Sequence, residues 1–175
     1  GFGVKENNFV GQGISLDSNF LLSSDSFKGK FSVTNPNYKN TDRSVYTSVE
    51  AVETDNYKTF GYKTNKTGIS LGTNFEYYDD LYFGVGNSNF YEKIETNSSA
   101  SARQQAQEGD YWDSFVELDF NYDKRNQKFQ TSQGFRNYFS TDLPLVSETN
   151  TLANTFISTN YYEYFNNNIL KSSFY

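Results

Sequence analysis

The chain has 175 residues and a formal net charge of −6 at pH 7, and it contains neither cysteine nor histidine. This composition excludes disulfides, thiolate zinc sites and the Ser-His and Cys-His catalytic pairs, and the acidic balance argues against nucleic acid as a partner. Aromatic residues make up 19% of the chain, far more than in disordered proteins, so we expect a folded structure.

Apolar and polar side chains alternate along most of the chain, which is the pattern of a half-exposed β-strand. In the segment 115–122, Val116, Leu118 and Phe120 share one face while Glu117 and Asp119 share the other. In chain order, we predict about ten strands, at 2–9, 14–22, 27–34, 44–53, 69–77, 81–93, 115–122, 135–143, 151–164 and 168–175. No run of apolar residues is long enough for a membrane helix.

The links between these strands differ in length. Short links are predicted at 10–13, 77–80 and 165–168, and long ones at 53–65 and 94–112. The segment 98–108 favours a helix by composition but has no apolar stripe, so we place it in a loop. Outer-membrane barrels combine short periplasmic turns and long extracellular loops with strands that alternate between lipid and lumen. The sequence therefore predicts an all-β, antiparallel transmembrane β-barrel.

This barrel prediction assigns a side of the membrane to each link. We expect 94–112 to be extracellular, and 10–13, 35–43, 123–134 and 165–168 to face the periplasm. Aromatic residues near strand ends are expected to form interfacial girdles, although cross-strand packing is an alternative. The residues concerned are Tyr77, Tyr78, Tyr82, Tyr111, Trp112, Tyr161, Tyr162 and Tyr164.

Three turn segments, taken together and in order, resemble the barrel of the BamA-type outer-membrane protein assembly factors. The first is 7–13, with an Asn-aromatic-aliphatic-Gly-x-Gly pattern, and the second is 31–44, with a strand that ends in Pro and an Asp turn. The third is 123–135, with Asp-x-Arg before a Gly turn, although Gln130 replaces the family's usual Pro and one residue is inserted before the Gly. The motif residues are Asn8, Gly11, Gly13, Pro36, Asp42, Asp123, Arg125 and Gly134.

The resemblance implies an incomplete barrel. Residues 1–9 are similar to the second strand of a sixteen-stranded family barrel, and 168–175 to about the eleventh. We therefore expect residues 1–175 to form a partial barrel domain, a fragment that begins with Gly1 and ends within a strand. The POTRA domains, the remaining strands, the seam and the Arg-Gly-aromatic loop of the family would then lie outside the chain.

The resemblance also implies a function. Members of the BamA-type family are non-enzymatic insertases of the outer membrane of Gram-negative bacteria. Their clients are unfolded outer-membrane proteins, and their partners are lipid and assembly lipoproteins. They need no cofactor. A client strand would add to an exposed strand edge by backbone hydrogen bonds. The alternatives are a passive porin or transport barrel and a soluble β-sandwich that binds glycans or partners.

Other constellations offer little chemistry. Glu117 and Asp119 stand about 6–7 Å apart on one strand face, which suits a glycosidase pair, but alternating lumen carboxylates explain them better. Asp80 follows another Asp in a turn and lacks a spaced set of calcium ligands. Asp123 and Arg125 form either a salt bridge or two exposed turn charges. We therefore expect no catalytic, metal or cofactor site.

Overall fold

The computed structural model describes residues 1–148, 151–165 and 168–175. These residues form one antiparallel sheet of ten strands in sequence order. The strands are β1 (Phe2–Phe9), β2 (Ile14–Leu22), β3 (Ser26–Asn35), β4 (Ser44–Asn56), β5 (Tyr62–Tyr78), β6 (Leu81–Thr96), β7 (Gly109–Asp123), β8 (Gly134–Val146), β9 (Ala153–Glu163) and β10 (Ile169–Phe174). All ten predicted strands are present, and the two central residues of the predicted turn 165–168 lie outside the described part.

Three short helical turns interrupt the links between strands. They are η1 (Tyr38–Asn40), α1 (Tyr57–Phe60) and α2 (Ala102–Gln105). Helix α2 lies inside the segment 98–108 that we placed in a loop, and a reciprocal capping box between Ser101 and Gln104 stabilises its single turn. No helix in the part of the chain that the structure describes is long and apolar enough to cross a membrane.

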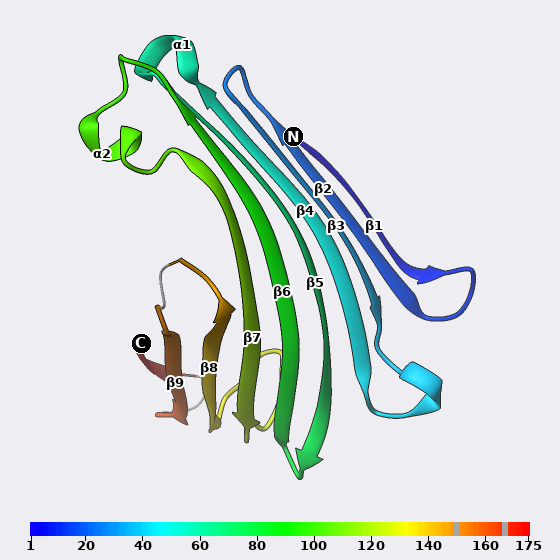
Figure 1. The fold of residues 1–175 in the computed structure, drawn as a ribbon. Helices are drawn as coiled ribbons and strands as arrows, with labels where there is room; N and C mark the ends of the chain where they lie inside the picture. Colours follow the sequence, from blue (N-terminus) through cyan, green and yellow to red (C-terminus); the bar gives the residue numbers. More distant parts are fainter. Residues whose placement is uncertain (149–150, 166–167) are drawn as a thin grey trace.

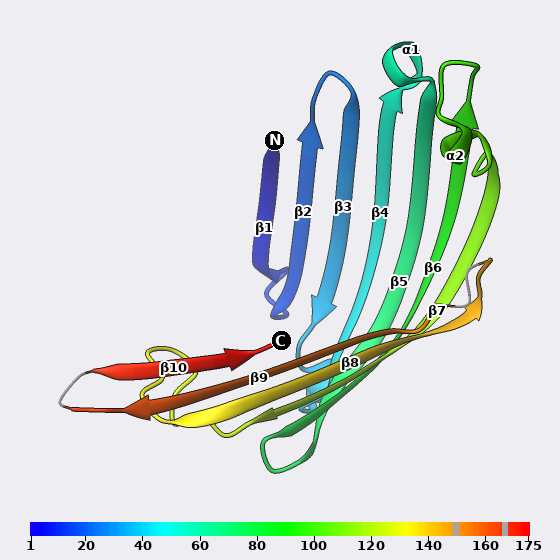
Figure 2. The same cartoon turned by 90° about the vertical axis from the view of Figure 1, so that its left-hand side faces the viewer.

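The sheet is strongly curved and open (Figure 1). Figure 2 shows β8, β9 and β10 turned far from the direction of β2–β6, as the right-handed twist of neighbouring strands accumulates. Strand β1 pairs only with β2, and β10 pairs only with β9, so the strand order has two free ends within the described residues. This confirms the prediction of an open antiparallel sheet.

Antiparallel pairing sends alternate links to opposite ends of the sheet. The three motif turns, at 10–13, 36–43 and 124–133, lie at one end, which we name the motif end, together with the tight turn 79–80. Helices α1 and α2 lie at the other end, which we name the helix end (Figure 1). The sequence correctly predicted which links share an end of the sheet, but the side of the membrane that each end faces stays a prediction.

The predicted asymmetry of link lengths is only partly right. The links 10–13 and 79–80 are short, and the link 97–108, within the predicted 94–112, is the longest in the described part of the chain. Strand β4 continues to Asn56 and β5 begins at Tyr62, so the expected long link 53–65 is mostly paired strand. Two links at the motif end, 36–43 and 124–133, are longer than this one. The extra strand length is polar and pairs through charges, as in the Lys63 Nζ to Glu53 Oε1 contact of 2.7 Å, and a polar strand end resembles a loop in sequence.

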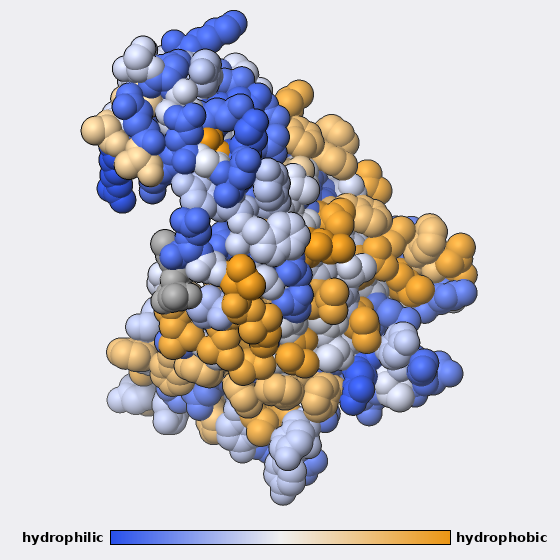
Figure 3. Space-filling model, in the orientation of Figure 1, coloured by the Kyte–Doolittle hydropathy of each residue, from blue (hydrophilic) through white to orange (hydrophobic). Residues whose placement is uncertain are grey.

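One face of the sheet, which we name the apolar face, carries a row of phenylalanines. Phe75, Phe83, Phe120, Phe139 and Phe156 stand opposite one another on β5–β9, and the ring centroids of Phe83 and Phe120 are 5.0 Å apart. Apolar residues cover much of the surface in Figure 3, below the polar α1–α2 region. Because the described chain is a single sheet with no second layer, this face is exposed, and the β-sandwich alternative is wrong.

The apolar face is bounded by aromatic residues. Toward the helix end, the boundary is formed by Tyr91 and Trp112, which are register partners. Toward the motif end, it is formed by Tyr77. The distance between the two can be counted along β5, because Tyr91 is also the register partner of Thr67, which lies on the same strand as Tyr77. These limits are about ten residues apart, or about 34 Å along the strand, which becomes about 26 Å at a tilt of about 40°. That height matches the apolar band of an outer-membrane barrel.

Strands β4–β7 continue beyond this band, and there the same face becomes charged. Its ion pairs join Lys63 to Glu53 and Asp55, and Lys93 to Glu95. The girdle prediction is only partly right, because three of its residues stand in register with the polar face instead. They are Tyr82, Tyr111 and Tyr161, opposite Glu76, Glu92 and Gly134 respectively.

Candidate functional site

The motif residues occupy three separate turns at the motif end. The first turn reverses the chain between β1 and β2. The Gly13 amide donates to Asn8 Oδ1 at 2.7 Å, and the Gly11 amide donates to the Asn8 carbonyl at 3.0 Å. Gly11 and Gly13 have φ of 72° and 68°, and a Cβ on either would meet no atom within 4 Å. These glycines therefore serve backbone conformation rather than close packing.

The second turn joins β3 to β4 through η1. Pro36 directly follows the last residue of β3, where no ladder donor is needed. The Tyr38 amide donates to the Arg43 carbonyl at 2.8 Å and closes the loop. In the described structure, Asp42 makes no hydrogen bond or ion pair, so it does not cap the turn. Arg43 places its guanidinium 5.0 Å from the centroid of the Phe75 ring.

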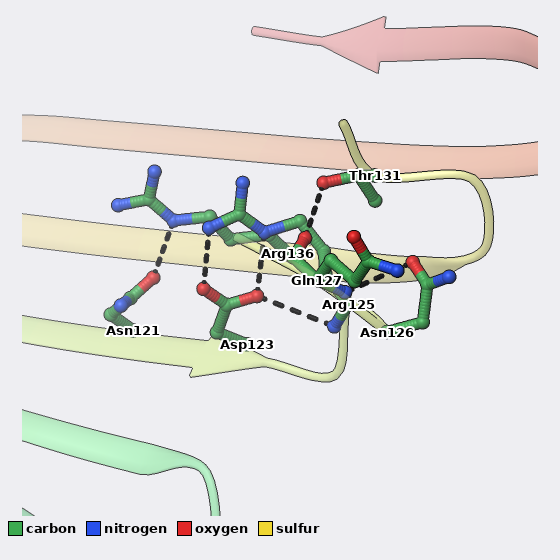
Figure 4. Close-up of polar contacts among 7 residues, drawn as sticks. All are labelled: Asn121, Asp123, Arg125, Asn126, Gln127, Thr131 and Arg136. Carbon is green, nitrogen blue, oxygen red and sulfur yellow. Dashed lines mark hydrogen bonds and ion pairs between the residues drawn. The ribbon is translucent and has the colours of Figure 1, made fainter. Parts of the chain in front are cut away.

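The third turn contains a two-point ion pair between Asp123 and Arg125. Arg125 Nε donates to Asp123 Oδ1 at 2.7 Å, and Nη2 donates to Oδ2 at 2.6 Å (Figure 4). The Arg125 and Asp123 side chains are only 15% and 8% exposed. The hydrogen bonds to Asp123 raise the pKa of Arg125 further above its usual range. Of the two interpretations that the sequence left open, a salt bridge or two exposed turn charges, the structure shows a shielded salt bridge.

The rest of the third turn is held by side-chain to backbone hydrogen bonds. Asn126 Oδ1 accepts from the amides of Ser132 and Gln133, both at 3.2 Å. Thr131 Oγ1, on a residue that is almost fully buried, donates to the Gln127 carbonyl at 2.6 Å (Figure 4). This link, the longest at the motif end, therefore has an ordered internal frame.

Gly134 ends this loop in a backbone conformation that favours glycine. Its φ is 103°, and a Cβ at this position would overlap the carbonyl oxygen of Lys124. Lys124 in turn contacts Asp80 in the β5–β6 turn at 2.6 Å, and this hydrogen bond raises the pKa of Lys124. The third turn is thus fastened to the neighbouring hairpin.

A second constellation, on the polar face, was not predicted. The Tyr46 side chain of β4 lies over Gly72 of β5 and Gly86 of β6 and reaches the Glu117 carboxylate of β7. Tyr46 and Gly72, then Gly72 and Gly86, then Gly86 and Glu117 are register partners. A glycine within each of two neighbouring strands was the available signal, because such a glycine often marks a close approach by another group.

The neighbouring carboxylate on β7 also has a tyrosine partner. The Tyr138 hydroxyl of β8 donates to Asp119 Oδ1 at 2.6 Å. Glu117 and Asp119 thus each contact a tyrosine and serve to join strands, an arrangement that differs from a glycosidase acid pair. Within the described residues, no group of three or more Asp or Glu side chains is placed to hold a metal ion.

The structure gathers some motif residues and separates others. Asp123, Arg125 and Gly134 belong to one framed loop, and Asn8, Gly11 and Gly13 to one tight turn. Across the sheet, the first and second turns are separated by the width of β2 and β3, and the second and third by β4–β7. The motif residues therefore form three independent turns at one end of the sheet, and the role of this set stays a prediction.

Comparison with known proteins gives a consistent result. The family model described as the Omp85 superfamily domain matches residues 8–174. Among solved structures, the chain is similar to the crystal structure of BamA from Haemophilus ducreyi lacking POTRA domains 1–3, with a TM-score of 0.67 and 19% sequence identity. The alignment covers 91% of this chain and 34% of that one. No curated protein matches the chain.

Proposed function

The chain belongs to the Omp85 superfamily, and from this premise we propose that it is part of an outer-membrane barrel that assists the folding and insertion of other β-barrel proteins. The chain spans about a third of the BamA structure that it resembles. We therefore also propose that the full-length protein contains the remaining barrel strands and POTRA domains. We propose that it lies in the outer membrane of a Gram-negative bacterium.

The observation that carries this proposal is the division of one open sheet into two faces. The apolar face has the height of a bilayer core between Tyr91 and Tyr77, while the opposite face carries the Tyr46, Glu117 and Asp119 contacts. Such a sheet needs lipid on one side and water on the other. The fold likeness to BamA and the order of the three motif turns support an assembly factor within this class.

The proposed mechanism uses no catalytic side chain. In a complete barrel of this family, an exposed strand edge pairs with a client strand through backbone hydrogen bonds. Unpaired backbone groups in hydrocarbon cost several kcal/mol each, so each new pair favours insertion, and folding of the client supplies the free energy. Assembly lipoproteins and lipid are the further proposed partners.

A reconstitution experiment tests the proposal. The full-length protein that carries this chain is placed in lipid vesicles, a urea-denatured outer-membrane barrel is diluted into them, and its folding is followed by heat-modifiable migration on gels. We expect faster folding than in vesicles that hold an unrelated porin at equal protein content. Equal rates, combined with a stable ion conductance, would contradict the assembly role and favour the passive transport barrel.

A further inference from the structure

Two grooves lie close together on the surface at the motif end. The first, of about 460 Å³, is lined by charged and aromatic side chains and is named the polar groove; the second, of about 260 Å³, is lined by apolar and aromatic side chains and is named the apolar groove. The polar groove is lined by Tyr38, Lys39, Thr41, Asp42, Arg43, Phe75 and Glu76. The apolar groove is lined by Tyr77, Leu81, Phe83 and Phe120.

Phe75 connects the two grooves. Its ring centroid lies 5.7 Å from that of Phe83, which in turn lies 5.0 Å from that of Phe120. The apolar groove therefore continues from the polar one along the row of phenylalanines, on the face that we assign to lipid. Tyr77, at its border, is 73% exposed, as expected for an aromatic residue at a membrane interface.

The polar groove contains two cations that lack a carboxylate partner. Arg43 lies 5.0 Å from the centroid of the Phe75 ring, and Lys39 lies 5.4 Å from that of Tyr38. Neither forms an ion pair with any residue that the structure describes, whereas Lys124, at the same end, is paired with Asp80. Two cations held over aromatic rings are positioned to accept an anionic group.

The same groove also contains a carboxylate without a partner. Asp42 has no partner among residues 1–148, 151–165 and 168–175. Glu76 also borders the groove, but its side chain belongs to the polar face and accepts a hydrogen bond from the Asp80 amide at 2.7 Å. The groove thus presents both signs of charge within one small area. A ligand that carries only a phosphate would leave the Asp42 carboxylate facing its negative charge, whereas a zwitterion satisfies both the two cations and this carboxylate.

We propose that the two grooves together bind one zwitterionic glycerophospholipid with a phosphate and a primary ammonium group. Arg43 and Lys39 contact the phosphate, Asp42 contacts the ammonium, and an acyl chain lies over Phe83 and Phe120. The inference rests on the proposed function only in that the apolar face must meet a bilayer. It adds a defined lipid site on the outside of the barrel.

Native mass spectrometry of the full-length protein tests this site. The detergent-solubilised protein is mixed with equal amounts of phosphatidylethanolamine and phosphatidylglycerol, and the retained lipid is identified. We expect preferential retention of phosphatidylethanolamine. Replacement of the Arg43 guanidinium by an amide in R43Q should reduce its retention about tenfold, as expected for the loss of a charge-assisted hydrogen bond. The loop should survive, because Tyr38 contacts only the backbone of Arg43.

Two further variants complete the design. D42N should lower the preference for phosphatidylethanolamine over phosphatidylglycerol, since it removes a contact to the ammonium. K128Q is the matched control, because Lys128 lies at the same end over the Tyr82 ring, 5.7 Å from its centroid, and outside both grooves. It should leave retention unchanged.

The outcomes separate this inference from the proposed function. Equal retention of both lipids, or equal retention by R43Q and K128Q, would overturn the lipid site while client folding in vesicles remains intact. Preferential retention of phosphatidylglycerol would also overturn it. Loss of client folding with unchanged lipid retention would instead contradict the assembly role. Heat-modifiable migration of each variant confirms that its barrel is folded.

Discussion

Tyr46 occupies the space in which Gly72, its register partner on the next strand, has no side chain. A Cβ placed on Gly72 would lie 2.5 Å from the Tyr46 hydroxyl oxygen, and one on Gly86 would lie 2.7 Å from the same atom. One tyrosine therefore crosses two strands and reaches a third. This contact ties four strands together on the polar face, where no second layer of structure packs in the described chain.

The contact predicts that Gly72→Ala and Gly86→Ala destabilise the full-length barrel. Overpacking of this kind costs about 1–3 kcal/mol, and we expect that range in reversible urea unfolding in lipid vesicles. Ser70→Ala, on the same strand and face as Gly72, should change little. If Gly72→Ala in a Tyr46→Ala background costs as much as in the wild type, the two residues are not coupled, and this interpretation is wrong.

The facing of β7 predicts unequal effects of two neighbouring substitutions. Leu118→Arg puts a charge on the lipid side and should cost about 2–4 kcal/mol near the middle of the bilayer. Glu117→Gln keeps a hydrogen-bonding group near Tyr46 and should have a small effect. Unfolding free energies of the two full-length variants decide this assignment, and equal losses would contradict it.

The surroundings of Gly134 predict that Gly134→Ala destabilises the folded protein more than Gly11→Ala does. Both have positive φ, but a Cβ on Gly134 would also overlap the Lys124 carbonyl, while one on Gly11 meets open space. Gly11→Ala should cost about 1 kcal/mol for backbone conformation alone, and Gly134→Ala clearly more. Thermal unfolding of both variants gives the comparison, and a smaller loss for Gly134→Ala would show that the close approach of Lys124 carries no penalty.

The shielded ion pair predicts that Asp123→Asn loosens the third turn. It removes the charge that Arg125 contacts at two points, which costs roughly 1–3 kcal/mol for a shielded group left partly unsatisfied. Trypsin should then cleave faster after Lys124, Arg125 and Lys128 in the folded protein. Asp42→Asn, which removes a carboxylate without a partner in the described chain, is the control. Identical cleavage of the two variants would show that the pair does not order the loop.

The two ends of the sheet predict opposite labelling from outside the cell. A cysteine at Ser99, in the helix-end loop, should react with a membrane-impermeant thiol reagent on intact cells, and one at Gln127 should not. Because this chain has no cysteine, each engineered thiol is its only one, and other cysteines of the full-length protein are removed first. The reverse pattern would invert the proposed orientation.

Strand positions could be predicted closely because a half-exposed strand leaves a period of two in the sequence. The ends of β4–β7 toward the helix end could not be predicted in this way. Beyond Tyr91 and Trp112 both faces of the sheet meet water, so the alternation of apolar residues stops while strand pairing continues. Polar pairs such as Lys63 with Glu53 then extend the ladder. Hydrophobic alternation detects the part of a strand that meets lipid.

The candidate site was predictable only where its residues are close in sequence. Asp123 and Arg125 are two residues apart, so a salt bridge was one of two open interpretations. Tyr46 and Gly86 meet because the registers of β4, β5 and β6 align them, and register follows from the whole sheet rather than from local pattern. The same holds for the meeting of Arg43 with Phe75.

The β5–β6 hairpin pairs Tyr62–Glu76 with 82–96 without a shift in register, through a turn of only two residues. Closing so short a loop costs little chain entropy, and hairpins form within microseconds once their ends meet. Every other strand then joins beside its neighbour in sequence. We therefore expect such a sheet to grow by zippering outward from its longest hairpin, since no segment has to wait for a distant partner before it is ordered.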